Sequence, residues 1–174
     1  MSGFLQGTVQ WLEQMHLRPE VVVLIVSALP VFEIRGGMLV GLVLFHGRLP
    51  PLEVLGLGVV GNIITVTPLL YIIEPLSRWL YGNRWADRIF HWLFTKAKKH
   101  ASKVNRWGPL GLVAFTAIPF AGNGAMTAAL IAILLNMRKR RAVAALYAGI
   151  VVSGIVMLLL AEGVRAGVGG VMGR

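Results

Sequence analysis

Four long apolar stretches dominate the chain, and the length of each predicts how it meets a membrane. They cover residues 21–45, 52–73, 109–135 and 142–160. A helix crosses the hydrocarbon core with about 20 residues, because each residue adds about 1.5 Å along its axis. Residues 52–73 and 142–160 have this length with no charge near their centres. We therefore predict a transmembrane helix for each of these two stretches.

The first apolar stretch, residues 21–45, is interrupted at its centre by the string PVFEIRGG. Proline removes a backbone donor and glycine tolerates irregular backbone, so we predict two shorter helices with a break between them. Charged side chains are costly in the middle of a membrane and often serve a function there. The break and its charges are expected at Glu33, Arg35, Gly36 and Gly37.

The third stretch, residues 109–135, is interrupted by the string AIPFAGNG, which again predicts two short helices. The turn residues there suit a break, and an asparagine can cap the helix that follows. This second break is expected at Pro119, Gly122, Asn123 and Gly124, with Asn123 as the cap.

The basic residues predict the orientation of the chain. Its net charge is +10, and the excess lies in two segments. Residues 78–106 hold eight basic residues and one acid, and residues 138–141 read RKRR. Clusters of Lys and Arg beside membrane segments stay on the cytoplasmic side. Because both flanks of residues 109–135 are then cytoplasmic, we predict that this stretch enters the membrane and returns as a re-entrant hairpin.

The first broken stretch is either a second re-entrant hairpin or a kinked full span, and the hairpin makes the chain a repeat. Residues 1–77 and 78–174 would each hold an interfacial helix, a hairpin and one span, so the second copy is inverted. An ungapped offset of 88 residues pairs Gly36 with Gly124 and Gly61 with Gly149. The predicted fold is thus an all-α integral membrane protein, a single domain built as an inverted repeat.

The remaining segments complete this prediction. Residues 4–16 are short and mixed, which favours an interfacial helix, and residues 78–106 are basic and rich in tryptophan, which is typical of a membrane interface. Residues 161–174 are predicted to form a short glycine-rich tail outside the membrane.

Composition supports a membrane protein and excludes several classes of function. Hydrophobic residues make up 56% of the chain and charged residues 14%, whereas soluble domains carry about a quarter charged residues. There is no cysteine, and the four histidines lack metal-ligand spacing, so no metal and no other cofactor is expected. A nucleic-acid partner is not expected, because the basic residues flank apolar runs instead of forming one face of a soluble scaffold. No catalytic set is recognisable, so we do not expect an enzyme.

Glu33 and Arg35 are the first candidates for chemistry. A structural role as a buried ion pair is the alternative, but side chains two positions apart point away from each other on a helix. At a broken helix, Arg35 and free backbone amides favour binding of an anion such as phosphate. Desolvation favours the protonated form of a carboxyl group, so Glu33 is a candidate for carrying protons.

Three further sets of residues are weaker candidates. Asn62 lies in the middle of a predicted span, where an interhelical hydrogen bond is the simplest role and substrate contact the alternative. The hydroxyls of Thr67 and Ser153 are expected to bond their own helices. Arg106 precedes the second hairpin and is a candidate for attracting lipid headgroups, while the second break is expected to contact substrate.

The strings EIRGGM, GN at 61–62 and FTAIPFAGNGAMTAALIA resemble those of the small multidrug export protein family. The resemblance covers about residues 30–155. Through it the chain is similar to the DedA superfamily (the SNARE-associated or VTT group). That resemblance implies paired re-entrant hairpins and the movement of lipids such as undecaprenyl phosphate, with proton coupling. It departs at residues 121–123, where Pro-Gly-Thr is expected, and in the second hairpin, which lacks the superfamily's arginine.

The leading hypothesis from the sequence is a transporter for a phosphate-bearing lipid in the cytoplasmic membrane of a prokaryote, with membrane lipids and protons as partners. A proton-coupled exporter of small organic cations is the first alternative, and a structural partner of other membrane proteins is the second. A homodimer is compatible with so small a chain.

Overall fold

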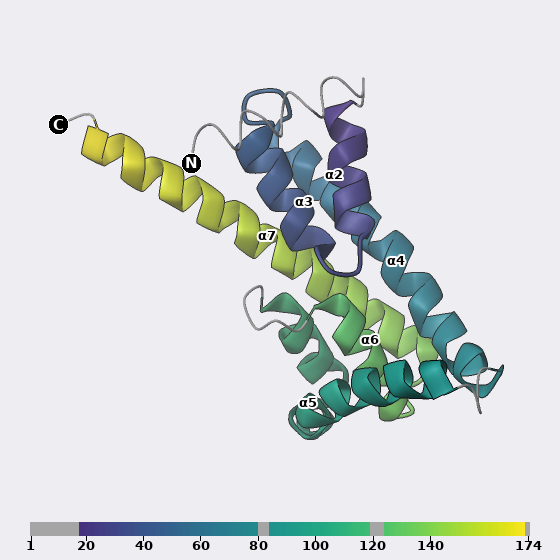
Figure 1. Ribbon diagram of the computed structural model, residues 1–174. Helices are drawn as coiled ribbons and strands as arrows, with labels where there is room; N and C mark the ends of the chain where they lie inside the picture. Colours follow the sequence, from purple (N-terminus) through teal and green to yellow (C-terminus); the bar gives the residue numbers. More distant parts are fainter. Residues whose placement is uncertain (1–17, 80–83, 119–123, 173–174) are drawn as a thin grey trace. The chain divides into compact units, whose positions relative to one another are not determined.

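A computed structural model describes residues 18–79, 84–118 and 124–172, and every regular element in these ranges is helical (Figure 1). The all-α prediction is therefore confirmed, while the predicted interfacial helix of residues 4–16 lies outside the described residues. In chain order the elements are α2 (Pro19–Ala28), α3 (Glu33–Leu39), the π-helix η1 (Val40–Leu44), α4 (Pro51–Trp79), α5 (Arg84–Ala117), α6 (Ala125–Leu134) and α7 (Lys139–Met172).

Within the described ranges, two helices are long and apolar enough to cross a membrane, and they coincide with the two predicted spans. They are Pro51–Ile73 in α4 and Lys139–Val164 in α7, with mean hydropathies of 1.8 and 2.5. The glycine-rich residues after 160 continue the second helix, since α7 extends to Met172. Each glycine weakens a helix by only about 1 kcal/mol, and no proline is present there to remove a donor.

The first broken stretch forms a pair of helices, α2 and α3, that pack against each other (Figure 1). The break lies at residues 29–32, before Glu33, and not at Glu33–Gly37 as predicted. Pro30 ends the helix, and the carbonyl of Leu29 accepts hydrogen bonds from the amides of Phe32 (3.1 Å) and Glu33 (2.8 Å), which closes the turn. The new helix therefore begins at Glu33, and Gly36 and Gly37 are helical.

The second broken stretch begins at a bend inside α5. Gly108 has φ 55° and ψ −130°, a conformation that glycine adopts readily, and it separates the amphipathic first part of α5 from a short apolar arm starting at Pro109. This arm and α6 belong to helices that pack on each other. The N-cap of α6 is Gly124 rather than the predicted Asn123, and it has no side-chain cap hydrogen bond. Asn123 itself, with Pro119 and Gly122, lies outside the described residues.

The chain divides into two compact units. The first is Met1–Gly61 with Gly154–Arg174, and the second is Asn62–Ser153. Each unit thus contains one helix pair together with parts of both long helices. The predicted repeat boundary at residues 77/78 falls inside the second unit, and the repeat remains a prediction.

In the first unit, α2 packs against one glycine of α3 and one glycine of α4. A Cβ on Gly61 would lie 2.5 Å from the Leu24 carbonyl oxygen and 2.8 Å from Ser27 Cβ, and one on Gly37 would overlap the Ser27 hydroxyl. The Ser27 hydroxyl donates to the Val23 carbonyl at 2.8 Å. Helices in membranes commonly approach through such small residues.

In the second unit, the apolar arm of α5 meets α7 in a contact of the same type. A Cβ on Gly149 would lie 3.0 Å from the Val113 carbonyl oxygen and 2.5 Å from Thr116 Cβ. The Thr116 hydroxyl donates to the Leu112 carbonyl at 2.8 Å. In each unit, therefore, a glycine of a long helix contacts a backbone carbonyl oxygen of the neighbouring helix. It also contacts a serine or threonine that lies three residues after that carbonyl.

Also in the second unit, α4 and α7 run antiparallel. The hydroxyls of Thr67 and Tyr147 share a hydrogen bond of 2.7 Å, and Lys139 Nζ lies 5.4 Å from the centre of the Tyr71 ring. Residue numbers rise along α4 while they fall along α7, which sets the two chain directions opposite.

Candidate functional site

Glu33 is a buried carboxylic acid at the first residue of α3. Its relative exposure is 8%. Its backbone has φ 51°, a left-handed conformation that costs a residue with a side chain about 1–2 kcal/mol compared with right-handed backbone. Residues held in such conformations concentrate at functional sites. The combination of burial, charge and backbone strain makes Glu33 the first candidate site residue.

Contacts of Ile34, the residue after Glu33, show where the start of α3 lies along the two candidate spans. Ile34 packs onto two glycines of the long helices: an added Cβ on Gly58 would lie 3.2 Å from Ile34 Cγ1, and one on Gly154 would lie 2.8 Å from Ile34 Cδ1. Both glycines belong to the first unit and lie inside the candidate spans, roughly two turns or more from either end. Glu33 therefore begins a helix at the level of the interior of both spans.

Arg35, Gly36 and Gly37 follow on the same helix. Arg35 is half-buried, whereas Glu33, two residues earlier, is buried. A Cβ on Gly36 would lie 2.5 Å from Phe32 Cβ, and Gly37 touches Ser27. The two glycines thus serve close packing of the helix pair, and Glu33 and Arg35 are the residues that carry charge.

Asn62 is buried on α4, with 1% relative exposure, and within the described residues neither its amide nitrogen nor its carbonyl oxygen has a hydrogen-bond partner. Among the described residues, the interhelical hydrogen bond that the sequence suggested is not present. A buried polar group without a partner costs about 1–3 kcal/mol, and each such group calls for an explanation such as an absent ligand or water.

Ser153 on α7 shares this property and was missed by sequence reasoning. It is 2% exposed, and its hydroxyl has no hydrogen-bond partner among the described residues, so the expected bond to its own helix is absent. Thr67 does make that bond, to the Ile63 carbonyl at 2.7 Å. The only signal in the sequence was a hydroxyl inside an apolar span, which is far more often satisfied locally.

The remaining predicted site residues are placed less fully. Gly124 is half-buried in extended backbone directly before α6. Arg106 is exposed near the end of the amphipathic part of α5, beside Trp107, which is 68% exposed. Within the described ranges, no three His, Cys, Asp or Glu side chains gather in a way that would hold a metal ion.

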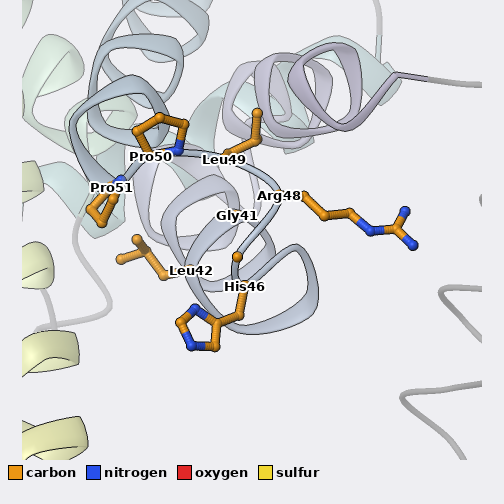
Figure 2. A pocket seen from close by; sticks show the side chains of 8 residues that line it. Gly41, Leu42, His46, Arg48, Leu49, Pro50 and Pro51 are labelled. Carbon is orange, nitrogen blue, oxygen red and sulfur yellow. The ribbon is translucent and has the colours of Figure 1, made fainter.

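Each unit also has a surface cavity where its helix pair leads into a long helix. In the first unit the cavity measures about 400 Å³ and is lined by Gly41, Leu42 and His46–Pro51. Figure 2 shows the His46 ring beside Leu42, while the Arg48 side chain extends away from Pro50 and Pro51. In the second unit a cavity of about 260 Å³ is lined by Leu70, Ala132, Ile133, Asn136, Met137 and Lys139.

Comparison with known proteins matches the chain to a protein family. A family model described as "Putative small multi-drug export protein" matches residues 33–156, which is more than half of the chain and begins at Glu33. No curated protein and no solved structure matches.

Proposed function

The chain belongs to this family of small multidrug export proteins, and on that premise we propose that it is a membrane transporter that expels small organic cations in exchange for protons. The family is one of exporters and not a class of enzymes. Two helices with the length and hydropathy of membrane spans support the location. We further propose the cytoplasmic membrane of a prokaryote, with residues 78–106 and 138–141 on the cytoplasmic side.

The observation that carries this proposal is the buried carboxyl group of Glu33 at the depth of the span interiors. An ionised carboxylate is expensive in such surroundings, so it favours either a proton or a positively charged partner. A proton and an organic cation would therefore compete for Glu33. Alternation between these two occupants is the chemical basis of exchange, because binding of one requires release of the other.

Asn62, Ser153 and Arg35 would assist in this scheme. The carboxamide of Asn62 and the hydroxyl of Ser153, which have no hydrogen-bond partner among the described residues, each offer hydrogen-bonding capacity near the middle of their own span. Arg35 repels cations, which favours release once Glu33 is protonated. Pro119, Gly122, Asn123 and Gly124, the predicted second break, are proposed as further residues that contact substrate.

A phosphate-bearing lipid such as undecaprenyl phosphate is the second candidate substrate, and Arg35 is the observation that favours it. Guanidinium groups bind phosphate through charge-assisted hydrogen bonds, and Arg35 lies two residues from Glu33 in the first turn of α3. In this alternative Arg35 would hold the phosphate, and Glu33 would exchange the proton.

We also propose that both helix pairs are re-entrant hairpins and that the two halves form an inverted repeat. The antiparallel α4 and α7 support this, since inversion requires opposite directions for the two spans. Their first residues, Pro51 and Lys139, lie 88 positions apart, which is the offset found in the sequence. Gly61 and Gly149 also make the same type of contact, each with a carbonyl oxygen and a hydroxyl-bearing residue of the packed helix. Labelling tests the topology: cysteines introduced at Arg106 and Arg138 should react from the same side of the membrane, and reaction from opposite sides would refute the second hairpin.

Transport by purified protein in liposomes tests the function. With an outward-directed export assay driven by a pH gradient, wild type should move a fluorescent organic cation, and Glu33→Gln should reduce the rate at least 100-fold. Glu53→Gln removes the same charge at an exposed position of α4 and serves as the control, with an expected change below twofold. Equal loss in both variants, or full activity of Glu33→Gln, contradicts the proposal.

Arg35→Gln separates the two substrates. If an organic cation is carried, this variant keeps at least a third of the wild-type rate. If a labelled polyprenyl phosphate is carried, that lipid moves in wild type, and Arg35→Gln abolishes its movement. Movement of neither probe by wild type would leave a structural role in the membrane as the remaining interpretation.

A further inference from the structure

The cavity of the second unit combines apolar walls with a basic edge. Leu70, Ala132, Ile133 and Met137 supply carbon atoms, and Asn136 and Lys139 supply polar ends. Its volume of about 260 Å³ is below the roughly 300–1,000 Å³ of pockets that enclose a whole small molecule. A cavity of this size suits one part of a larger molecule whose remainder stays outside.

The cavity is built by the turn that ends α6. The Asn136 amide donates to the Ile133 carbonyl at 3.0 Å, and the Met137 amide donates to the Ala132 carbonyl at 3.0 Å. Asn136 has φ 51°, and this pair of bonds is the Schellman arrangement, in which asparagine is one of the few residues that tolerate the left-handed position. Because the turn is tied by two backbone bonds, Asn136 and Met137 hold fixed positions at the cavity.

The edge of the cavity is strongly positive. Residues 138–141 are four consecutive basic residues, and all four are exposed. Lys139 lines the cavity and lies 5.4 Å from the centre of the Tyr71 ring, within range of a cation–π interaction that restricts its ammonium group. This edge coincides with the first residue of the candidate span Lys139–Val164, which places it at a membrane surface.

We propose that this cavity binds the headgroup of an anionic phospholipid. Lys139 and Asn136 contact the phosphate, and Leu70, Ile133 and Met137 contact the first methylene groups of the acyl chains, which continue into the bilayer. The corresponding cavity of the first unit is also lined by one basic residue, Arg48, but no run of basic residues comparable to residues 138–141 lies at its edge. Glu33 is not among the residues that line this cavity, and the proposed lipid site does not depend on which substrate is transported.

Lipid binding to the purified full-length protein in a neutral detergent tests the site. Phosphatidylglycerol should bind at least tenfold more tightly than phosphatidylcholine with the same acyl chains, as measured by native mass spectrometry. Lys139→Gln should weaken phosphatidylglycerol binding about fivefold, the effect of one basic residue at a charged lipid surface. Arg140→Gln removes the same charge from a neighbour that does not line the cavity, and it should weaken binding less than twofold. Equal effects of the two variants would mean diffuse attraction and overturn the site.

Asn136→Gly provides a second variant that keeps the fold. Glycine is favoured at the left-handed position, so the melting temperature should not fall, yet removal of the carboxamide should weaken phosphatidylglycerol binding at least threefold. Unchanged binding in this variant overturns the proposed contact. The last measurement is the binding of glycerol phosphate and of inorganic phosphate to the same protein. If either binds as tightly as the lipid, the ligand is a soluble phosphate and the assignment to a lipid is wrong.

Discussion

The two helix pairs of this protein share a framework and differ in chemistry. In the first pair, α2 rests on Gly61 through Ser27, and in the second the apolar arm of α5 rests on Gly149 through Thr116. Both hydroxyls donate to the carbonyl four residues earlier in their own helix. The first break, however, leads into a buried acid and a half-buried arginine, whereas residues 117–128 contain no charge at all.

This difference separates the residues that build the fold from the residues that are proposed to bind protons and substrate. A glycine facing a carbonyl and a small hydroxyl residue lets two helices approach closely, and that purpose is served equally well in both pairs. A charge in the interior of a membrane protein lowers stability and is retained for a function. We therefore expect substitutions in the shared framework to have matched effects in both pairs, and substitutions at the breaks to have unequal ones.

The largest difference in transport rate is expected between substitutions at the two breaks. Glu33→Gln should reduce proton-driven transport at least 100-fold, because the exchangeable charge is lost, while Gly124→Ala should reduce it less than threefold. Gly124 has φ −82°, which alanine adopts without strain. The initial rate of substrate efflux from liposomes measures both. Equal losses would show that the breaks contribute equally and that the comparison is mistaken.

The next largest effect is a matched loss of stability in the framework. Gly61→Ala and Gly149→Ala each place a methyl group within about 3 Å of a carbonyl oxygen of the packed helix. Overpacking of this kind costs about 1–3 kcal/mol, so both variants should melt several degrees lower in detergent.

Two glycines of the same helices provide the controls for this loss. A Cβ on Gly56 of α4 or on Gly163 of α7 would meet nothing within 4 Å. Gly56→Ala and Gly163→Ala should therefore melt at the wild-type temperature or slightly above it, because alanine favours the helix. A loss at Gly61 with none at Gly149 would break the equivalence of the two pairs.

A smaller effect of opposite sign is expected at Asn62. Asn62→Leu replaces a buried, unpartnered carboxamide by an apolar side chain of similar size, so it should raise the melting temperature, with a gain of about 1–2 kcal/mol. Transport should fall at the same time if the carboxamide contacts substrate. A variant that is less stable than wild type would mean that Asn62 has a partner which the described residues do not contain.

The smallest effect is expected at the two hydroxyls. Ser27→Ala and Thr116→Val remove a bond to a carbonyl of the same helix, and that bond contributes little to helix stability. Each should change the free energy of unfolding by less than about 0.5 kcal/mol, measured by denaturant titration in detergent micelles. A larger loss in only one of them would reveal a role specific to that pair.

Much of the fold could be predicted from the sequence. The two spans follow from the length of uncharged apolar sequence, and the start of the second helix pair follows from Gly108 and Pro109. The first break was predicted about four residues later than it is found, because Pro30 and not the glycine pair ends the first helix. The ungapped offset of 88 also slips by one residue inside the helix pairs, where Ser27 corresponds to Thr116.

The sequence by itself determined that this chain is helical, that it has two helices able to cross a membrane, and that Glu33 and Arg35 are its unusual charges. These follow from local composition, which sets hydropathy and helix breaks without reference to distant residues. Only the tertiary structure decided that Glu33 is buried in left-handed backbone, that Ile34 is held by Gly58 and Gly154, and that Asn62 and Ser153 lack hydrogen-bond partners among the described residues. Burial and hydrogen bonding depend on which helices meet, and residues far apart in the chain settle that.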